Sequence, residues 1–443
     1  MPRRAAVTAA GAAAAAAPVA DPDAAAALAA GDANVAVVRP EQYDAQLEAN
    51  VARVRGLFQG FELPEPEVHR SAPMHYRQRA EFRVWHEGDA CHYIMFARVP
   101  GCSTPRRFRL DSFPVGSEAM NVIMSEVMAA AAASGQLRRK LYQVNIHTTL
   151  SGEAMVALVY HKRLDEAWES EARALRARLR AALAERHGGG SGSSSSSSSS
   201  GGGGSSAGSS GGNGSGGGVV HVIGRSHKQK VALDADFVTE VLSVNGRDLA
   251  YKQVEGAFSQ PNSGVSAKML AWAQDVTRGS GGHDLLELYC GNGNFTVALA
   301  PCFRQVVATE VSKSSVEAAR ANLDANGAHN VFIARMSSAE FTETWRAKGT
   351  RNRLKGLAPW EELRLGTLLV DPPRAGLDDE SRQLLRDFER VVYVSCNPET
   401  LARDLRSVEG SHRVERFAVF DAFPYTEHIE CGAYLVRRQG GGV

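Results

Sequence analysis

The feature that most restricts the fold of this chain is an alternation of strand-like and helix-like segments from about Phe258 to the C-terminus. Four runs have the apolar, β-branched-rich composition of buried strands: 285–288, 305–309, 367–370 and 391–395. Strands that alternate with helices predict a largely parallel, doubly wound α/β sheet. Open sheets of this kind bind ligands beyond the carboxyl ends of their strands. The residues that follow these four runs are therefore the first candidates for a functional site.

The residues before this region predict a smaller α+β region that is interrupted by a flexible insertion. Apolar residues recur at helical spacing from Tyr43 to Phe58, and a second amphipathic helix is expected from Leu164 to Glu185. Strand-like pieces lie between these helices, at 80–86, 92–97, 141–148 and 153–161. The expected domains are an N-terminal α+β region over 39–187, a Gly/Ser-rich insertion over 188–218, the remainder of that region with a connecting hairpin over 219–257, and a C-terminal α/β domain over 258–443. Asn245-Gly246 marks the turn of the hairpin.

Residues 1–38 are rich in alanine and nearly free of bulky apolar residues, so they cannot bury enough surface to offset their ordering entropy. We expect a disordered leader. Arg3 and Arg4 at its start suit an organellar transit peptide, whereas scarce serine and the presence of Asp21 and Asp23 do not. A plastid or mitochondrial location follows if the leader is a transit peptide. A cytoplasmic location follows if it is a low-complexity extension.

The composition disfavours several classes of protein. With 44% hydrophobic and 22% charged residues the chain is an ordinary globular one, and a formal net charge of +1 indicates no particular partner. The six cysteines contain no C-x-x-C pair, which disfavours a zinc or iron–sulfur site and a disulfide scaffold. No segment approaches a transmembrane span. We expect neither a bound metal nor membrane association.

Two residues near the C-terminus have the chemistry of a nucleophile and a base. Cys396 follows the run 391–395 and precedes Asn397-Pro398, which ends the strand. A thiol there lies at the ligand-binding edge of the sheet, although an isolated cysteine is more often buried and inert. Glu430 enters the last strand-like run, where burial of a carboxylate raises its pKa and makes it a competent base. Together they predict covalent catalysis.

The first run leads into a glycine turn, 290–295, that has the form of a nucleotide cradle. Glycines let the backbone approach a ligand closely, and the helix expected near Phe295 offers amide donors. Glu310, after the second run, is placed to accept hydrogen bonds from a ribose diol. The third glycine of the dinucleotide fingerprint is missing, which favours S-adenosylmethionine over NAD. After the third run, two prolines hold Asp371 and Arg374 in place.

At these motifs the chain resembles the RNA uracil-5-methyltransferases, and within them the bacterial-type tRNA (uracil-54-C5) branch. The resemblance extends to 258–262 (FSQPN) and 428–432 (HIECG), and to 76–83 and 111–114 in the N-terminal region. It implies a Rossmann-like S-adenosylmethionine-dependent methyltransferase domain preceded by a smaller RNA-binding domain. S-adenosyl-L-methionine is the implied cofactor and tRNA the implied partner, with the protein a monomer that needs no other protein. The cysteine cluster and N-terminal barrel common in relatives that act on ribosomal RNA are not evident in the sequence.

The resemblance also implies a mechanism and a set of site residues. Cys396 adds to C6 of uridine 54 in the T-loop, C5 takes the methyl group, and Glu430 removes the C5 proton to leave 5-methyluridine. The implied cofactor contacts are Gln260, Tyr289, Asn294, Glu310 and Asp371.

An arginine-rich stretch suggests where RNA binds. Arg77, Arg79 and Arg83 alternate, so on a strand they share one face. Arginine neutralises phosphates and aromatic rings stack on unpaired bases, which makes Phe108 and Phe113 candidate supports for the RNA loop, with Arg374 a further candidate contact. A solvated charged face is the alternative interpretation.

Other functions stay open at this point. The chain could be a tRNA-binding folding chaperone with dispensable or lost catalysis, or it could methylate another RNA such as ribosomal RNA. An amino-methyltransferase would place an aromatic residue after Asp371-Pro372-Pro373, where this chain has Arg374. Folate-dependent methylation of the same carbon is disfavoured by the glycine cradle.

Overall fold

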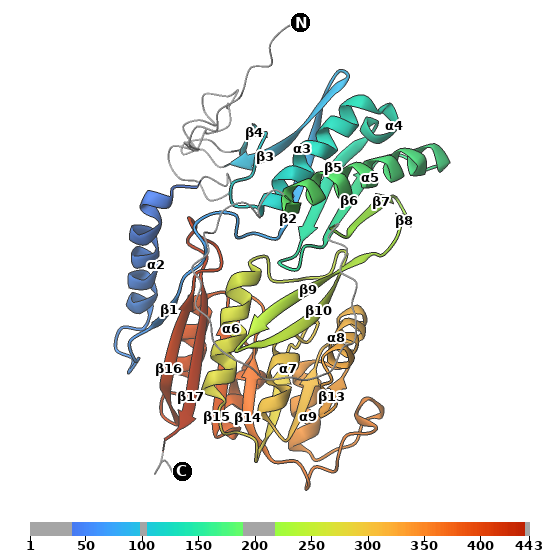
Figure 1. The fold of residues 1–443 in the computed structure, drawn as a ribbon. Coiled ribbons are helices and arrows are strands. Elements are labelled where there is room, and N and C mark those ends of the chain that lie inside the picture. Colours follow the sequence, from blue (N-terminus) through green and yellow to red (C-terminus); the bar gives the residue numbers. More distant parts are fainter. Residues whose placement is uncertain (1–37, 98–103, 189–217, 439–443) are drawn as a thin grey trace, which may run out of the picture.

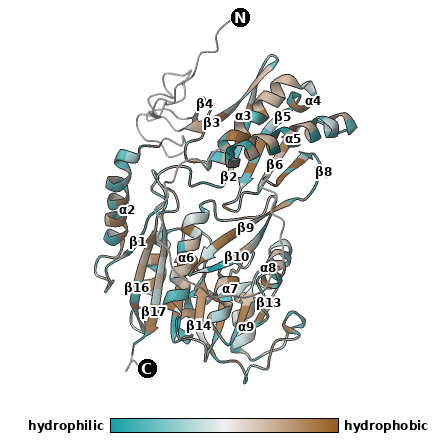
Figure 2. Cartoon of the chain, viewed as in Figure 1, coloured by the Kyte–Doolittle hydropathy of each residue, from teal (hydrophilic) through white to brown (hydrophobic). Residues whose placement is uncertain are grey.

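The computed structural model describes residues 38–97, 104–188 and 218–438, which form two bodies, one above the other in Figure 1. The upper body has a seven-stranded sheet and the lower body an eight-stranded one. Hydrophobic colours gather on the strands of both sheets, and hydrophilic ones on the loops and outer helices (Figure 2). Nearly all of the predicted leader (1–38) and of the Gly/Ser insertion (188–218) lies outside the described residues. No helix in the described ranges has the length and apolarity needed to cross a membrane.

The upper sheet is antiparallel except for one parallel pair, β6 with β7. From edge to edge its strands are β4 (Arg106–Leu110), β3 (Ala90–Ala97), β2 (Arg79–Glu87), β5 (Leu141–Thr148), β6 (Ala154–Tyr160), β7 (Val220–Ser226) and β8 (Gln229–Ala232). Three helices cover one face: α3 (Glu118–Ala133), α4 (Gly135–Arg138) and α5 (Glu166–Gly188). Ile123 and Trp168 of these helices pack with Phe82 and Val144 of the strands in one core. The strands and the helix expected here are confirmed to within a few residues at their ends.

The lower sheet has five parallel strands at its centre and one side, and an antiparallel extension at the other. In order its strands are β1 (Glu67–His69), β16 (His412–Phe420), β17 (Glu430–Arg437), β15 (Arg390–Ser395), β14 (Leu365–Val370), β11 (Asp284–Leu288), β12 (Gln305–Thr309) and β13 (Val331–Ala334). The strands β15, β14, β11, β12 and β13 are mutually parallel, while β17 runs antiparallel to both β15 and β16. The doubly wound α/β fold is confirmed, and the antiparallel position of β17 is an addition that the sequence did not indicate.

Helices cover both faces of this sheet. One face carries α6 (Ser263–Val276), α7 (Asn294–Leu299) and α8 (Lys313–Ala325), together with the hairpin of β9 (Phe237–Val244) and β10 (Arg247–Val254). The other carries α2 (Tyr43–Leu57), α9 (Ser338–Arg346), α10 (Asp379–Leu384) and α11 (Pro398–Arg406). Short 3-10 helices complete the described elements: η2 (Pro40–Gln42), η3 (Ala300–Cys302), η4 (Asn352–Leu354) and η5 (Leu385–Asp387). We call the face of the sheet covered by α6, α7, α8 and the hairpin the α6 face, and the face covered by α2, α9, α10 and α11 the α11 face.

The hairpin turn is confirmed at Asn245-Gly246. Both residues have positive φ, 50° and 81°, as a two-residue turn that matches the strand twist requires.

The first helix, α2, and the strand β1 differ from the prediction, which grouped them with the RNA-binding region over 39–187. α2 buries its predicted stripe, Tyr43 to Phe58, in the core of the α11 face, and β1 pairs with β16 at the edge of the lower sheet. An amphipathic stripe shows that a helix buries one face but does not identify the surface against which it packs. The chain therefore begins its described part on the lower body, enters the upper one at β2, and returns.

Candidate functional site

Cys396 is held at the carboxyl end of β15 by a tight connection to α11. The Ser395 hydroxyl accepts a hydrogen bond from the Asn397 amide at 3.1 Å and donates one to the Asn397 carbonyl at 3.0 Å. Asn397 caps α11, because its side-chain oxygen accepts from the Glu399 amide at 3.1 Å, and Pro398 starts the helix. The half-buried thiol thus lies between a strand end and the positive end of a helix.

Glu430 is brought to Cys396 by the antiparallel pairing of β17 with β15. Ser395 pairs with Cys431, so the next position along this register sets Cys396 opposite Glu430. Residues directly opposed on antiparallel strands have Cβ atoms about 4.5–5.5 Å apart. Glu430 is 5% exposed, so its carboxyl is desolvated.

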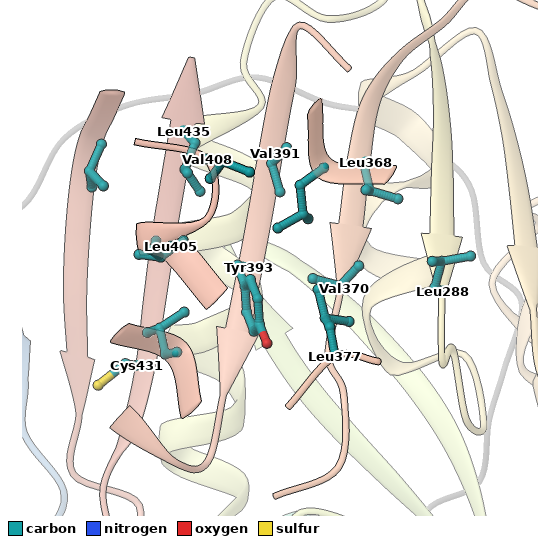
Figure 3. Close-up of a cluster of buried hydrophobic side chains, with 14 of the residues drawn as sticks. Leu288, Leu368, Val370, Leu377, Val391, Tyr393, Leu405, Val408, Cys431 and Leu435 are labelled. Carbon is teal, nitrogen blue, oxygen red and sulfur yellow. The ribbon is translucent and has the colours of Figure 1, made fainter. Parts of the chain in front are cut away.

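Strand alternation places both side chains on the α6 face. Val394, two residues before Cys396, packs in the α6-face core, as does Tyr434, four residues after Glu430. Cys431 and Tyr393 point the other way, into the α11-face core, where Figure 3 shows them together. Cys431 is therefore a packing residue.

The loop after β14 brings Asp371 and Arg374 beside this pair. Asp371 follows Val370 and continues the alternation onto the α6 face. The Arg374 carbonyl accepts from the Asn397 side chain at 3.0 Å and from the Thr400 hydroxyl at 3.4 Å, which ties this loop to the one that carries Cys396. The exposed Arg374 guanidinium lies 3.4 Å from Nδ1 of His428.

Burial and mutual repulsion raise the pKa values of the acidic groups of the site. Burial and the nearby Asp371 together raise the pKa of Glu430 to about 8, against the opposite effect of Arg374. Burial also raises the pKa of Asp371 to about 7. The pKa of the Cys396 thiol is raised to about 11 by burial and by the charges of Glu430 and Asp371, against the effect of Arg374. The effects of Asp371 and Arg374 on Glu430 and Cys396 are consistent with their positions around one site.

The predicted glycine turn follows β11 and has the backbone that such a turn needs. Gly291 and Gly293 have φ of 56° and 81°, and a Cβ on Gly293 would lie 3.2 Å from that of Ala319 on α8. Tyr289 also has a positive φ, 62°, and its hydroxyl accepts from Ser338 at 2.8 Å. A non-glycine residue in this conformation is typical of ligand sites.

Glu310 lies one residue beyond β12 and faces the glycine turn. One carboxylate oxygen accepts from the Gly291 amide at 3.1 Å and the other from the Ser312 amide at 2.7 Å. Both oxygens keep lone pairs for a diol. Asn294 begins α7, and its carbonyl accepts from the Tyr251 hydroxyl at 2.9 Å.

Gln260 lies where the two bodies meet. It is half-buried and precedes Pro261, whose carbonyl accepts from the Gln78 amide at 2.7 Å, and Asn262, which caps α6. The structure thus gathers Cys396, Glu430, Asp371 and Arg374 at one edge and places the glycine turn with Glu310 along the same edge.

Glu287 is a site candidate that the sequence analysis did not single out. It lies within β11, is 1% exposed, and one of its carboxyl oxygens has no hydrogen-bond partner among the described residues. Burial and, to a lesser extent, the charge of Asp371 raise the pKa of Glu287 to about 8. A carboxylate inside an otherwise apolar buried run was the signal that could have identified it.

These residues fit S-adenosylmethionine. The cofactor carries a sulfonium and an α-ammonium. The α6 face supplies the buried carboxyls of Glu287 and Glu430 and the half-buried carboxyl of Asp371, which a cation would stabilise in the ionised form. Glu310 suits its ribose diol.

The outer face of the upper sheet carries the candidate RNA contacts. Along β2, Arg79, Arg83 and Trp85 alternate with buried residues and point away from the helices. Trp85 is 42% exposed, and the Arg107 guanidinium of β4 lies 3.8 Å above its ring centroid. Arg77 precedes the strand and is half-buried, with Nε donating to the Arg79 carbonyl at 2.8 Å.

The assignment of Phe108 and Phe113 to RNA is wrong. They are 3% and 4% exposed and belong to the core beneath α3 and α5, where the Phe113 ring meets that of Phe82 at 5.1 Å. Rings buried there cannot stack on a base. The exposed aromatic residues are Trp85, Phe96 and Phe258.

The fold and this site define a Rossmann-like methyltransferase with a thiol and a carboxyl beside the cofactor edge. The solved Pyrococcus abyssi tRNA (uracil-54, C5)-methyltransferase, in complex with S-adenosyl-L-homocysteine, has a similar fold, with a TM-score of 0.58 at 20% identity over 89% of this chain and 83% of that one.

The chain belongs to the tRNA (uracil-5-)-methyltransferase family, whose sequence model matches residues 42–186 and 217–438. It is 48% identical over 407 residues to the tRNA/tmRNA (uracil-C(5))-methyltransferase of Chromohalobacter salexigens, covering 91% of this chain and 98% of the relative. The enzyme of the same description from Pectobacterium carotovorum is 46% identical, with 90% and 98% covered. The family expected from the motifs is therefore confirmed, and the chain is a methyltransferase.

Proposed function

We propose that this protein transfers the methyl group of S-adenosylmethionine to C5 of a uridine in tRNA through a covalent bond between Cys396 and C6 of the base. The register that sets Cys396 opposite Glu430 on the α6 face is the observation that carries the proposal. Uracil C5 is a weak nucleophile, so the reaction needs a thiolate at C6 and a base at C5, two adjacent ring atoms. The names of relatives at 48% and 46% identity support a tRNA uridine as substrate. We assign uridine 54 of the T-loop as the target.

Cys396 and Glu430 act on adjacent atoms of the same uracil ring, Cys396 at C6 and Glu430 at the C5 proton. The Cys396 thiolate bonds to C6, and the electrons of the C5=C6 bond move toward C4=O to form an enolate. When bound, the cofactor supplies an electrophilic methyl group on its sulfonium. Once C5 carries the methyl group, the Glu430 carboxylate takes the C5 proton, the electrons of that C–H bond restore C5=C6, and the thiolate leaves C6.

The raised pKa values of these two groups make their ionisation depend on what binds. A bound sulfonium would favour the thiolate and the carboxylate through its positive charge, and so does the Arg374 guanidinium, whose charge lowers the pKa of both Cys396 and Glu430. The free protein thus holds a weakly reactive thiol, and we expect cofactor binding to activate it.

RNA binds, in this proposal, along the outer face of the upper sheet. Arg79, Arg83 and Arg107 provide phosphate contacts and Trp85 a stacking surface. Phe258, 76% exposed and two residues before Gln260, offers a ring to an unpaired base near the cofactor edge. The target base must leave its stack to reach Cys396.

The test is methyl transfer from labelled S-adenosylmethionine to unmodified tRNA, followed by mapping of the labelled nucleoside. We expect label in 5-methyluridine at position 54 and none in a ribosomal RNA fragment. Cys396→Ala should abolish transfer and keep RNA binding, whereas Cys302→Ala, which removes another half-buried thiol of the same body, should leave transfer intact. Undiminished transfer by Cys396→Ala would refute the nucleophile, and label at another position would refute the target.

A further inference from the structure

The loop that leads into Glu430, residues 421–429, lies between β16 and β17 and has no helix or strand of its own. Internally it is fastened by a turn, in which the Thr426 amide and hydroxyl both donate to the Phe423 carbonyl, at 3.2 and 2.8 Å. The Thr426 hydroxyl in turn accepts from the His428 amide at 3.0 Å. Glu430 is the first residue of β17, so its backbone is fixed by the sheet on one side and by this loop on the other.

Side chains of the helix α2 donate hydrogen bonds to carbonyls of this loop, although α2 lies nearly four hundred residues earlier in the chain. The Asn50 side chain, 7% exposed, donates to the Thr426 carbonyl at 2.8 Å, and Gln46 donates to the same oxygen at 3.3 Å. One turn further, Nη2 of Arg53 donates to the Glu427 carbonyl at 2.6 Å. The contacts of Asn50 and Gln46 with the Thr426 carbonyl are half-buried, so their loss would leave a poorly hydrated carbonyl without a partner, whereas the Arg53 contact with Glu427 is exposed.

The segment between β1 and β2 holds the same loop from a second side. The Tyr76 hydroxyl donates to the Pro424 carbonyl at 3.1 Å, and the Tyr425 hydroxyl donates to the Pro73 carbonyl at 2.9 Å. The Tyr425 ring also contacts that of Tyr43 at the start of α2, with centroids 6.0 Å apart. Tyr425 itself has a positive φ, 65°, a conformation that persists only where surrounding contacts impose it.

We propose that Asn50 and Arg53 are positioning residues for the reaction, because they hold the 421–429 loop and thereby fix where the Glu430 carboxylate stands relative to C5 of the base. This inference rests on the proposed function. It explains why α2 packs on the lower body although its sequence precedes the RNA-binding strands. Removal of a proton from carbon needs the base within hydrogen-bond reach, and a displacement of about 1 Å can cost 10²-fold in rate.

The test compares Asn50→Leu and Arg53→Met with Arg55→Met. Arg55 lies on the same helix but pairs with Glu65 on the surface and does not contact the loop. We expect the first two variants to lower kcat by about tenfold or more with KM for tRNA and cofactor within about twofold of wild type. Addition of Cys396 to C6 does not need Glu430, so the covalent RNA–protein adduct should accumulate. Arg55→Met should behave as wild type.

Two activity outcomes would overturn the proposal: kcat equal to that of Arg55→Met, or adduct and turnover falling in parallel, as simple loss of folded protein would produce. Hydrogen exchange of the free protein tests the loop without any activity. The Thr426 and His428 amides should exchange faster in Asn50→Leu and Arg53→Met than in Arg55→Met, and equal exchange would overturn the proposal. If wild-type protein methylates no uridine, the proposed function fails, and the exchange measurement still decides whether α2 holds the loop.

Discussion

The removal of the C5 proton should accelerate with pH across the neutral range, because Glu430 must be ionised to act as a base. Its pKa, raised to about 8 by burial and by Asp371, leaves about 1% of the carboxyl ionised at pH 6, about 9% at pH 7 and about 90% at pH 9. The rate of this step should therefore rise about tenfold per pH unit below pH 7 and level off near pH 9. Arg374→Gln should move the rise to higher pH, because the guanidinium lowers the pKa of Glu430.

The assay is the decay of the covalent adduct after a pH jump, followed by rapid quench and a denaturing gel. In the adduct the sulfur of Cys396 is already bonded to carbon, so the pKa of the thiol does not enter the measured rate. Glu430→Gln should give slow decay without this pH dependence. A wild-type decay rate that is constant between pH 6 and 8, or a Glu430→Gln variant that keeps the wild-type slope, would refute the assignment of the base.

Three further predictions concern the RNA face, the cofactor edge and the packing beneath the site. Trp85→Ala should weaken tRNA binding by about 1–3 kcal/mol in a fluorescence titration. Arg107→Gln should lower the slope of log K for tRNA against log salt by about 1, and neither variant should change the affinity for the cofactor. If the affinity and the slope both stay unchanged, tRNA does not bind at this face. The pKa of Glu287 is about 8 in the folded protein, against an ordinary value of 4.5, so its contribution to stability is fully present below pH 4.5 and is lost as the pH rises to 8. Glu287→Gln should therefore raise Tm at pH 8 and leave it little changed near pH 4.5. Equal shifts of Tm at both pH values would contradict the raised pKa of Glu287. Gly432→Ala would set a Cβ 2.8 Å from the Trp272 ring and should cost about 1–3 kcal/mol of unfolding free energy, measured by urea titration; a neutral effect would show that the ring can move aside.

The doubly wound sheet could be predicted because its central strands are continuous apolar runs that end at Gly, Pro or acidic residues. Those breaks are local, so they also identified the glycine turn, Glu310, Asp371 and Cys396. The position of β17 between β15 and β16 depends on pairing across the sheet, which no local pattern in 430–437 encodes. The partner of α2 was missed for the same reason.

The sequence contained a signal against the assignment of Phe108 to RNA. In Arg107-Phe108-Arg109-Leu110 the alternation of charged and apolar residues already sets Phe108 on the face opposite to the arginines. The assignment of Phe108 and Phe113 to RNA rested on composition alone, because aromatic residues lie near arginines in this stretch. Reading the period of two would instead have selected Trp85, which shares its face with Arg83.

The central claim is that Cys396 and Glu430 act on one pyrimidine ring. Its most direct test replaces uridine 54 of the tRNA with 5-fluorouridine, whose C5–F bond offers no proton to a base, and identifies the trapped product by mass spectrometry of the digested complex with S-adenosylmethionine. The account predicts a methylated 5-fluorouridine joined through C6 to the peptide that contains Cys396. A bond to any other residue, or methylation without a covalent product, would contradict it.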